Sequence, residues 1–316
     1  MDQAAAKPKS NRKYSWQNIK KDFKKNKALF LMGLPTVAFF IIFCYIPMGG
    51  LLMAFENYKP NLGLLHSKFV GIANFQSFFQ SIYFGRVLRN TIILSLLQLC
   101  IEFPFTILFA LLLNELASQK YKRTVQTISY MPNFISMVVV AGIIVDFCSS
   151  DGAITSIVSL FTGSNQNLLS IPGYWRTIYV VSDLWQGVGF GSIIYVAALA
   201  GIDKSLYEAA EIDGASKLRQ FFSITVPMIT PVVFYNLITQ LCTAFQEFNS
   251  AYLITQGGPR GSTTLISLLI YQKAFLSYDM GLASAMAWLL FVIVAIFTAI
   301  AFLSQKYWVY YSGDER

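Results

Sequence analysis

Six long runs of apolar residues dominate this sequence. They occur at about 29–55, 90–113, 124–147, 177–199, 224–249 and 279–304, and each reaches the ~20 residues that a helix needs to cross a bilayer. Only 13% of the 316 residues are charged, against about 25% in soluble domains. A soluble fold could not cover its surface with so few charges, and disordered chains are charge-rich. The sequence therefore predicts an all-α integral membrane protein with six transmembrane helices.

Basic residues are divided unevenly between the segments that join these runs. Segments 1–28, 114–123, 200–223 and 305–316 hold 17 Lys and Arg, whereas 56–89, 148–176 and 250–278 hold 7. Because cytoplasmic loops carry the excess of Lys and Arg, both termini are predicted to be cytoplasmic. The same rule accounts for the net charge of +8, so no nucleic-acid partner is expected. We expect a multi-pass protein of the cytoplasmic membrane, with its membrane domain at 29–304 and a tail at 305–316.

The basic N-terminal segment, 1–28, has an amphipathic pattern. Trp16, Ile19 and Phe23 share a helical face among five lysines between positions 20 and 27. This pattern is typical of a helix that lies on the cytoplasmic leaflet and contacts membrane lipid; the alternative is a solvated tail that only fixes orientation. The long polar stretch before the first apolar run excludes a cleavable signal peptide.

The loop at 200–223 carries strong local signals. Ser205 followed by Glu208 reads as a capping box at the start of a helix, and two turns of good helix formers follow. Gly214 fits the left-handed position after that helix, and Ser216 can cap a second short helix. A bare connector needs only a few residues, so this 24-residue loop is expected to dock a cytoplasmic partner.

A longer pattern runs through this loop into the fifth run. It consists of Glu208-Ala209-Ala210, three residues, Gly214, nine residues, Ile224, one residue, Val226 and Pro227. This pattern resembles the EAA loop of the permeases of binding-protein-dependent ABC importers, with Val226 in place of the usual Leu. The resemblance implies a type I ABC importer permease fold, in which the loop docks into a cleft on the ATPase and passes its closure to the membrane helices. The coupling residues that it implies are Glu208, Ala209, Ala210, Asp213, Gly214 and Pro227.

Other motifs extend the resemblance over most of the chain. Phe69-Val70-Gly71 with Asn74-Phe75, and Leu88-Arg89-Asn90-Thr91, are similar to the external segment and the start of the second span in carbohydrate permeases. Thr255-Gln256-Gly257-Gly258-Pro259, Tyr271, Ala274-Phe275, Gly281 and Ala283-Ser284-Ala285 resemble the region between the last two spans. The chain resembles most the larger permease of the maltose-type pair, in the branch for polysaccharides or lipoproteins.

The resemblance also implies a set of partners. These are a second permease subunit in a heterodimer, two ATPase subunits that bind ATP and magnesium, and an extracytoplasmic sugar-binding protein that delivers an oligosaccharide. The chain itself has no Gly-Lys dipeptide, which excludes a P-loop. It is therefore expected to be a transport subunit rather than an enzyme, with no cofactor of its own.

Polar side chains inside the spans indicate where a substrate would pass, because in lipid such groups are costly and face the bundle interior or a wet path. Asn236, Gln240, Thr243 and Glu247 recur at spacings of three and four, on one helical face. Amides and a carboxylate suit sugar hydroxyls, and aromatic rings suit the apolar faces of pyranoses. The predicted pathway comprises Asn236, Gln240, Thr243, Glu247, Tyr235, Phe245, Trp185, Gln186, Tyr130 and Asn133, with Asp183 and Ser136 offering the same chemistry.

Structural alternatives stay open for these residues. Each polar side chain could instead bond to a neighbouring helix or to the partner permease, and Glu247 could cap an outer gate. Glu102, two residues before Pro104, is assigned a structural role, in which it pairs with a basic group or satisfies the loosened backbone. The GxGxG pattern at 187–191 is expected to serve close helix packing, with space for substrate as the alternative.

Catalytic and metal sites are not expected. The one histidine, His66, falls in a predicted external loop. The four cysteines lie in apolar runs or at the end of one, and none forms a CxxC pair, so they read as small buried apolar residues. These counts leave neither a nucleophile–base set nor a metal site.

The predicted function is a permease subunit of an ABC importer that takes up an oligosaccharide or related sugar by ATP-driven alternating access. One alternative is an ABC permease for another solute, such as glycerol phosphate or a peptide. A phosphate would favour basic residues in the path, and the inner parts of the spans have none. A second alternative is an ion-driven secondary transporter, which usually shows inverted repeats and paired broken helices; the sequence shows neither.

Overall fold

The computed structural model describes residues 25–255, 257–258, 261 and 263–310. Trp16 and most of the predicted N-terminal surface helix lie outside the described residues. Six helical stretches within them are long and apolar enough to cross a membrane: Lys27–Phe55, Phe84–Glu115, Met137–Thr162, Pro172–Ala200, Lys217–Ala244 and Met280–Trp308. The predicted all-α membrane fold with six spans is confirmed. The side of the membrane that each terminus faces stays a prediction.

The chain divides into two compact units, 1–52 and 53–316. The described part of the first unit is one helical stretch, formed by α2 (Lys27–Phe40), the π-helical segment η1 (Ile41–Tyr45) and most of the 3-10 segment η2 (Ile46–Phe55). Pro47 has no backbone N–H to donate, and the hydrogen-bond spacing changes from π to 3-10 beside it.

The second unit begins with a small hairpin and a long helix. Strands β1 (Glu56–Asn57) and β2 (Lys68–Phe69) pair antiparallel, and α3 (Ala73–Phe79) leads into α4 (Phe84–Glu115). The predicted third span, 124–147, is not one continuous helix. It is broken into α5 (Gln119–Tyr130), the 3-10 turn η3 (Met131–Phe134) and α6 (Met137–Cys148), with Pro132 in the break and Ser136 capping α6.

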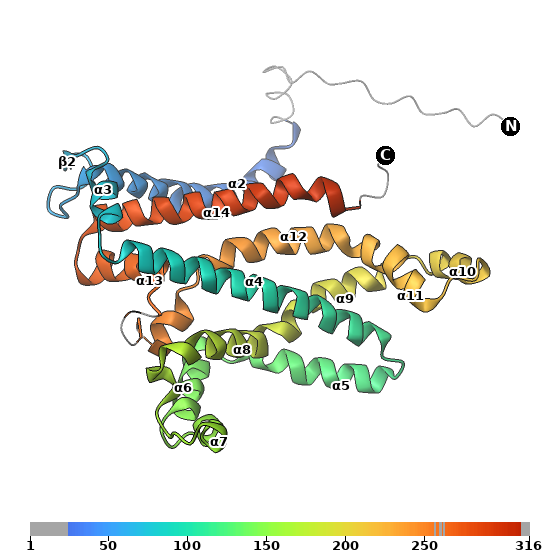
Figure 1. Ribbon diagram of the computed structural model, residues 1–316. Coiled ribbons are helices and arrows are strands. Elements are labelled where there is room, and N and C mark those ends of the chain that lie inside the picture. The colour runs from blue at the N-terminus through green and yellow to red at the C-terminus, as the bar shows by residue number, and fades with distance from the viewer. Residues whose placement is uncertain (1–24, 256, 259–260, 262, 311–316) are drawn as a thin grey trace. The chain divides into compact units, whose positions relative to one another are not determined.

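The remaining elements pack around α4. After α7 (Ala153–Thr162) and the turn η4 (Leu168–Ser170) come α8 (Pro172–Gly191) and α9 (Ile193–Ala200). The helix α12 (Val226–Ala244) is followed by η6 (Ala251–Thr255), α13 (Ile266–Tyr271), η8 (Gln272–Leu276) and α14 (Met280–Trp308). Helices α8, α9 and α12 each contact α4 (Figure 1), and these four helices position the site described below.

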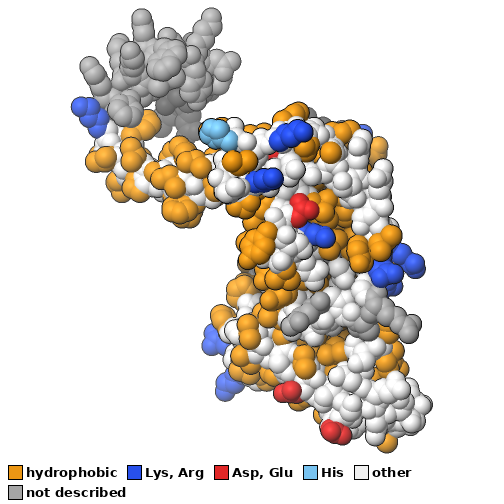
Figure 2. Space-filling view, turned by 90° about the vertical axis from the view of Figure 1, so that its left-hand side faces the viewer, with side chains coloured by type: hydrophobic (Ala, Val, Ile, Leu, Met, Phe, Trp, Pro, Cys, Tyr) orange, Lys and Arg blue, Asp and Glu red, His pale blue; other side chains and the backbone are white. Residues whose placement is uncertain are grey.

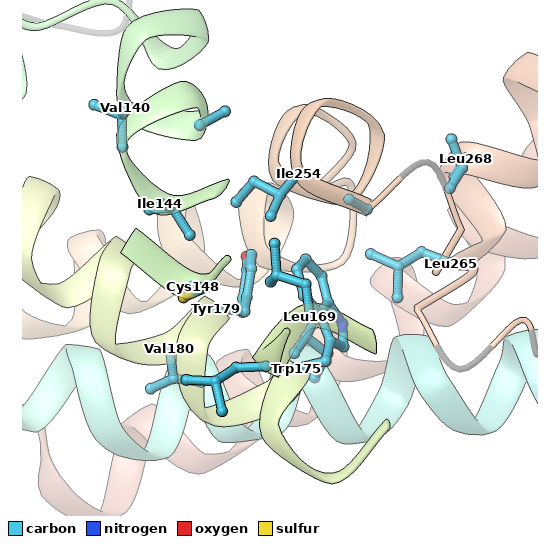
Figure 3. Close-up of a cluster of buried hydrophobic side chains, with 14 residues drawn as sticks. Val140, Ile144, Cys148, Leu169, Trp175, Tyr179, Val180, Ile254, Leu265 and Leu268 are labelled. Carbon is cyan, nitrogen blue, oxygen red and sulfur yellow. The ribbon is translucent and has the colours of Figure 1, made fainter. Parts of the chain in front are cut away.

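Apolar packing fixes these helices in place. One cluster joins α4, α6, α8, η6 and α13, with Trp175 and Tyr179 of α8 completely covered at its centre (Figure 3). A second joins α3, α4, α12, α13 and α14. Figure 2 shows hydrophobic side chains over much of one face and few charged ones, as expected of a surface that lipid or other subunits cover.

Several residues of the sequence motifs hold loops and the hairpin against the helices. The Asn90 side chain donates to the carbonyls of Gly261 and Thr264, each at 3.2 Å. The Asn74 side chain donates to the carbonyls of Ala54 and Glu56, each at 2.9 Å. A Cβ at Gly281 would lie 2.7 Å from the Glu56 carbonyl oxygen, so only glycine lets α14 approach this hairpin.

Candidate functional site

The loop at 200–223, which we call the coupling loop, folds into two short helices. The first, α10 (Lys204–Ile212), begins at Asp203, whose carboxylate accepts from the Ser205 backbone N–H at 2.9 Å. The predicted capping box at Ser205 and Glu208 is therefore wrong, because Ser205 already lies in the first turn of α10. Hydrogen bonds from the Ser205 backbone and side chain hold the pKa of Asp203 below its usual value.

The end of α10 agrees with the sequence. Gly214 adopts φ +71°, the left-handed conformation that disfavours other residues. Its N–H donates to the Glu211 carbonyl at 3.0 Å, and the Ala215 N–H donates to the Ala210 carbonyl at 2.9 Å. This pair of bonds is a Schellman motif, which satisfies the last carbonyls of the helix.

The second helix is continuous with the fifth span. Ser216 caps α11 (Lys217–Gln220) through the Arg219 N–H, as predicted, and the π-helical η5 (Phe221–Thr225) leads into α12. A surface ion pair of 2.6 Å joins Lys217 to Glu211; the hydrogen bond from Lys217 and its charge lower the Glu211 pKa. The two helices are thereby held in one bent unit.

The coupling loop is fastened to the membrane helices on one side and open on the other. The hydroxyls of Tyr207 and Thr225 lie 2.8 Å apart, and Tyr207 packs beside Ile202 and Ile229. Of the predicted coupling residues, Glu208, Ala209, Asp213 and Gly214 are exposed, while Ala210 and Pro227 are half-buried. Apolar side chains are also exposed there, with 87% of Ile212, 72% of Leu218 and 67% of Phe222 accessible. Such a surface marks a protein or membrane contact.

A second feature lies inside the helix bundle. A cavity of about 250 Å³ opens between α4, α8, α9 and α12, and nine of its ten lining residues carry polar side chains. The residues that line it are Gln98, Glu102, Thr106, Asp183, Gly191, Tyr195, Asn236, Thr239, Gln240 and Thr243. Hydroxyls, amides and carboxyls thus face one space within the predicted spans, which is the arrangement expected of a wet path.

Hydrogen bonds orient part of this lining. The Gln98 side-chain amide donates to the Asp183 carboxylate, and the Tyr179 hydroxyl donates to the Gln98 side-chain oxygen at 3.3 Å. In contrast, the Oε2 atom of Glu102 is buried without a hydrogen-bond partner among the described residues. Glu102 therefore keeps a free acceptor beside the cavity, and it forms no ion pair with a basic group among the described residues; a bond to the loosened backbone stays a prediction.

The glycines at 187–191 set the helix spacing around the cavity. A Cβ at Gly189 would lie 2.0 Å from the Ser129 carbonyl oxygen of α5, so this glycine allows α8 and α5 to touch. At Gly187 a Cβ would lie 3.1 Å from the Glu102 carboxyl, and at Gly191 3.2 Å from Thr106. Close packing is thus one role of the pattern, and room for cavity side chains is the other.

Some of the predicted pathway residues line this cavity, and others do not. Asn236, Gln240 and Thr243 line the cavity together with Thr239, so the polar face of α12 is real. Glu247 does not continue it, because α12 ends at Ala244 and the Glu247 carboxylate accepts from the Ser250 N–H at 2.8 Å.

Phe245 does not line this cavity either. It is 1% exposed in the second apolar cluster, where the centroid of its ring lies 4.8 Å from that of Phe297. Gln186 donates to the Ile135 carbonyl at 3.2 Å, beside the break before α6. Tyr235, Trp185, Tyr130 and Asn133 do not line this cavity, and their part in a pathway stays a prediction.

Sequence reasoning missed Gln98, Glu102 and Thr106 as a group. They repeat every four residues along α4 and all reach the cavity, so the signal was present as a polar stripe in the second run. Thr239 and Tyr195 were also missed. Thr239 lies three residues after Asn236 and four before Thr243, so the helical period places it on the same face, whereas Tyr195 is a single position in α9. No group of His, Cys, Asp and Glu among the described residues could hold a metal ion.

Comparisons with known proteins agree with this geometry. Residues 102–309 match the family described as "Binding-protein-dependent transport system inner membrane component". The chain is 37% identical over 250 residues to Protein LplB of Bacillus subtilis, covering 78% of this chain and 79% of that protein. It is 37% identical to the polygalacturonan/rhamnogalacturonan transport system permease protein YteP of the same organism, covering 78% of each.

A solved structure extends the likeness to the fold. A chain of a bacterial ABC transporter "involved in the import of the acidic polysaccharide alginate" superposes with a TM-score of 0.82 at 35% identity. The match covers 92% of this chain and 99% of that one. A second structure of the bacterial alginate transporter, in complex with a pentasaccharide-bound periplasmic protein, superposes with a TM-score of 0.80.

Proposed function

This chain belongs to the family of binding-protein-dependent transport system inner membrane components, and from that premise we propose how it works. It is a multi-pass permease subunit of an ABC importer in the cytoplasmic membrane, and its substrate is an oligosaccharide or related sugar. The names of several relatives, which specify polygalacturonan, lactose or maltose, support the sugar class, and so does the cavity, because amides and hydroxyls match sugar hydroxyls as both donors and acceptors.

One structural observation carries the mechanism. The coupling loop is joined to α12 by the Tyr207–Thr225 contact, and the same helix lines the cavity with Asn236, Thr239, Gln240 and Thr243. A displacement of the coupling loop on the cytoplasmic side is therefore passed along one rigid helix to the polar path. Tight packing transmits such displacements rather than absorbing them.

The partners follow from this arrangement. A second permease subunit covers the open side of the cavity, and two ATPase subunits hold ATP and magnesium and press on the exposed face of each coupling loop. A binding protein outside releases sugar when this closure opens the path outward. This chain binds no nucleotide, and its role is alternating access driven by the partners' ATP hydrolysis. The rival solute, glycerol phosphate, is disfavoured because no Lys or Arg among the described residues lines the cavity.

The test is sugar uptake by the complete importer in proteoliposomes. This chain is reconstituted with its permease partner, ATPase and binding protein, and a panel of oligosaccharides is offered beside glycerol phosphate and peptides. We expect an oligosaccharide to stimulate ATP hydrolysis and to accumulate inside only when ATP and the binding protein are present. Uptake that continues without ATP and stops when an ionophore collapses the ion gradient would identify a secondary transporter instead.

A further inference from the structure

The carboxyl groups of Glu102 and Asp183 are the acidic groups of the cavity lining, and no Lys, Arg or His among the described residues lines it. Neither carboxyl forms an ion pair with a described residue. We infer that Glu102 and Asp183 give the cavity a charge preference: it admits neutral and positively charged sugars, such as amino sugars, and excludes anionic ones, such as uronates. This inference rests on the proposed function and adds a substrate class to it.

The geometry fixes both carboxyls at the cavity rather than in a salt bridge elsewhere. Asp183 is held by Gln98, which in turn accepts from Tyr179, so its orientation is set by two neighbours. The Glu102 carboxyl occupies space that the absence of a side chain at Gly187 leaves open, because a Cβ there would lie 3.1 Å from Oε1. Its other oxygen, Oε2, is buried and has no hydrogen-bond partner among the described residues. A buried acceptor without a donor is costly, and a hydroxyl or ammonium group of a passing sugar would supply that donor.

The preference follows from the charge that the pair carries. The Glu102 and Asp183 carboxyls hydrogen-bond to each other, and two carboxyls in contact cannot both ionise, so the pair holds at most one negative charge. An ionised carboxyl in a space of low dielectric repels a uronate and attracts an ammonium group several times more strongly than it would in water. A protonated carboxyl offers hydrogen bonds to a neutral sugar but no positive charge to a uronate. In either protonation state the lining lacks the Arg or Lys that carboxylate recognition uses. Neutral sugars are held by the Asn236 and Gln240 amides and the threonine hydroxyls.

This assignment separates the chain from proteins that it resembles. The solved structure with the same fold is described as importing an acidic polysaccharide, and one relative is named for polygalacturonan. A shared fold does not transfer the substrate, because the charge of the path is set by a few side chains. In the lining that this chain provides, the acidic positions are 102 and 183.

The test measures the cavity's charge preference directly, with small thiol reagents of opposite charge. Thr239→Cys is introduced on the cavity wall of the complete importer, after Cys44, Cys100, Cys148 and Cys242 are replaced by alanine. The probes are a cationic and an anionic methanethiosulfonate of similar size, and the readout is the ratio of their reaction rates. The same ratio at Ser164→Cys, in an exposed loop that the sequence predicts to be external, corrects for the reagents' intrinsic reactivity.

We expect the cationic reagent to react about tenfold faster at position 239 after this correction, because a negatively charged cleft concentrates cations. The double change Glu102→Gln and Asp183→Asn should bring the ratio close to one, since both replacements keep size and hydrogen-bonding capacity. Asp146→Asn, an exposed carboxyl outside the cavity, should leave the ratio unchanged. Equal rates in the starting protein, or a preference that survives the double change, would overturn the inference.

A second measurement separates this inference from the proposed function. ATP hydrolysis by the complete importer is followed with uronate oligosaccharides and with their uncharged methyl esters. Stimulation by the acidic sugar as strong as by its ester overturns the charge preference and leaves the sugar importer intact. If the thiol reagents show the preference and no sugar of any charge stimulates hydrolysis or enters, the charge inference stands and the proposed function fails.

Discussion

The phenolic oxygen of Tyr207 lies 2.8 Å from the hydroxyl oxygen of Thr225, and this contact joins the first helix of the coupling loop to the N-terminal end of α12. Tyr207 also packs against the apolar cluster of Leu199, Ile202 and Ile229, which fixes its ring beside α12. The open face of the loop lies on the other side of α10. The contact is therefore placed to convert a push on the loop into movement of a span.

Tyr207→Phe removes this hydrogen bond and keeps the ring. A hydrogen bond of this kind contributes about 1 kcal/mol, so we expect sugar-stimulated ATP hydrolysis to fall roughly threefold to fivefold while basal hydrolysis is unchanged. The measurement is the ratio of stimulated to basal activity in proteoliposomes. Thr225→Val should lower the ratio similarly, and the double variant should be no worse than either single one. Additive losses would show that the two hydroxyls do not act as a pair.

Gly214→Glu should uncouple the loop. The residue has φ +71°, where a side chain costs about 1–2 kcal/mol, and an added carboxylate projects from the exposed face. We expect the subunits to co-purify less well and stimulated hydrolysis to be lost. Gly163→Glu is the matched control, because Gly163 also has a positive φ (+70°) at the end of α7, far along the chain from the loop. If both variants lose coupling equally, backbone strain rather than docking is responsible.

Gly189→Ala should loosen or distort the bundle. Its Cβ would lie 2.0 Å from the Ser129 carbonyl oxygen, so α8 and α5 must move apart, and overpacking of this kind costs about 1–3 kcal/mol. We expect a lower midpoint of thermal denaturation in detergent. Gly173→Ala provides the comparison, because it lies in the same helix with nothing within 4 Å of the added methyl. An unchanged midpoint for Gly189→Ala would mean that the two helices are not in contact.

Thr230→Val should also lower stability. Pro231 sits inside α12 without a backbone N–H, and the Thr230 hydroxyl donates to the Pro227 carbonyl at 2.6 Å while accepting from the Tyr310 N–H at 2.9 Å. Valine leaves both backbone groups without this partner, at a cost of about 1–3 kcal/mol.

Thr298→Val is the control for this change. The Thr298 hydroxyl is buried and has no partner among the described residues, so its removal should be neutral or slightly stabilising. The comparison uses thermal denaturation of the two variants under one condition. Equal effects of the two substitutions would contradict the assigned role of Thr230.

Local signals in the sequence were enough for part of the coupling loop. Gly214 and Ser216 were placed correctly because a left-handed residue and an N-cap depend on a few neighbouring backbone groups. The same reasoning failed at Ser205, because Asp203 is an equally good cap two residues earlier, and the start of a helix is its least certain feature. The pattern of helix formers cannot choose between two adjacent caps.

The polar face of α12 was predicted only in part. The helical period places Asn236, Gln240 and Thr243 on one face, but it carries no information on where α12 ends, and Glu247 lies beyond that end. Phe245 was taken as a pathway residue because it is near this face in sequence. Packing against Phe297, more than fifty residues later, decided its burial.

The sequence by itself determined that this chain spans a membrane with six apolar helices, because a span needs only length and hydropathy. It also determined the form of most of the coupling loop, which depends on local backbone bonds. Only the tertiary structure decided which helix faces meet. Gln98 and Glu102 of α4 lie more than eighty residues before Asp183 of α8, and the three share one cavity because Gly187, Gly189 and Gly191 let α8 approach its neighbours. Periodicity gives the spacing of a stripe along a helix, and the rotation of that helix in the bundle is set by contacts with distant segments.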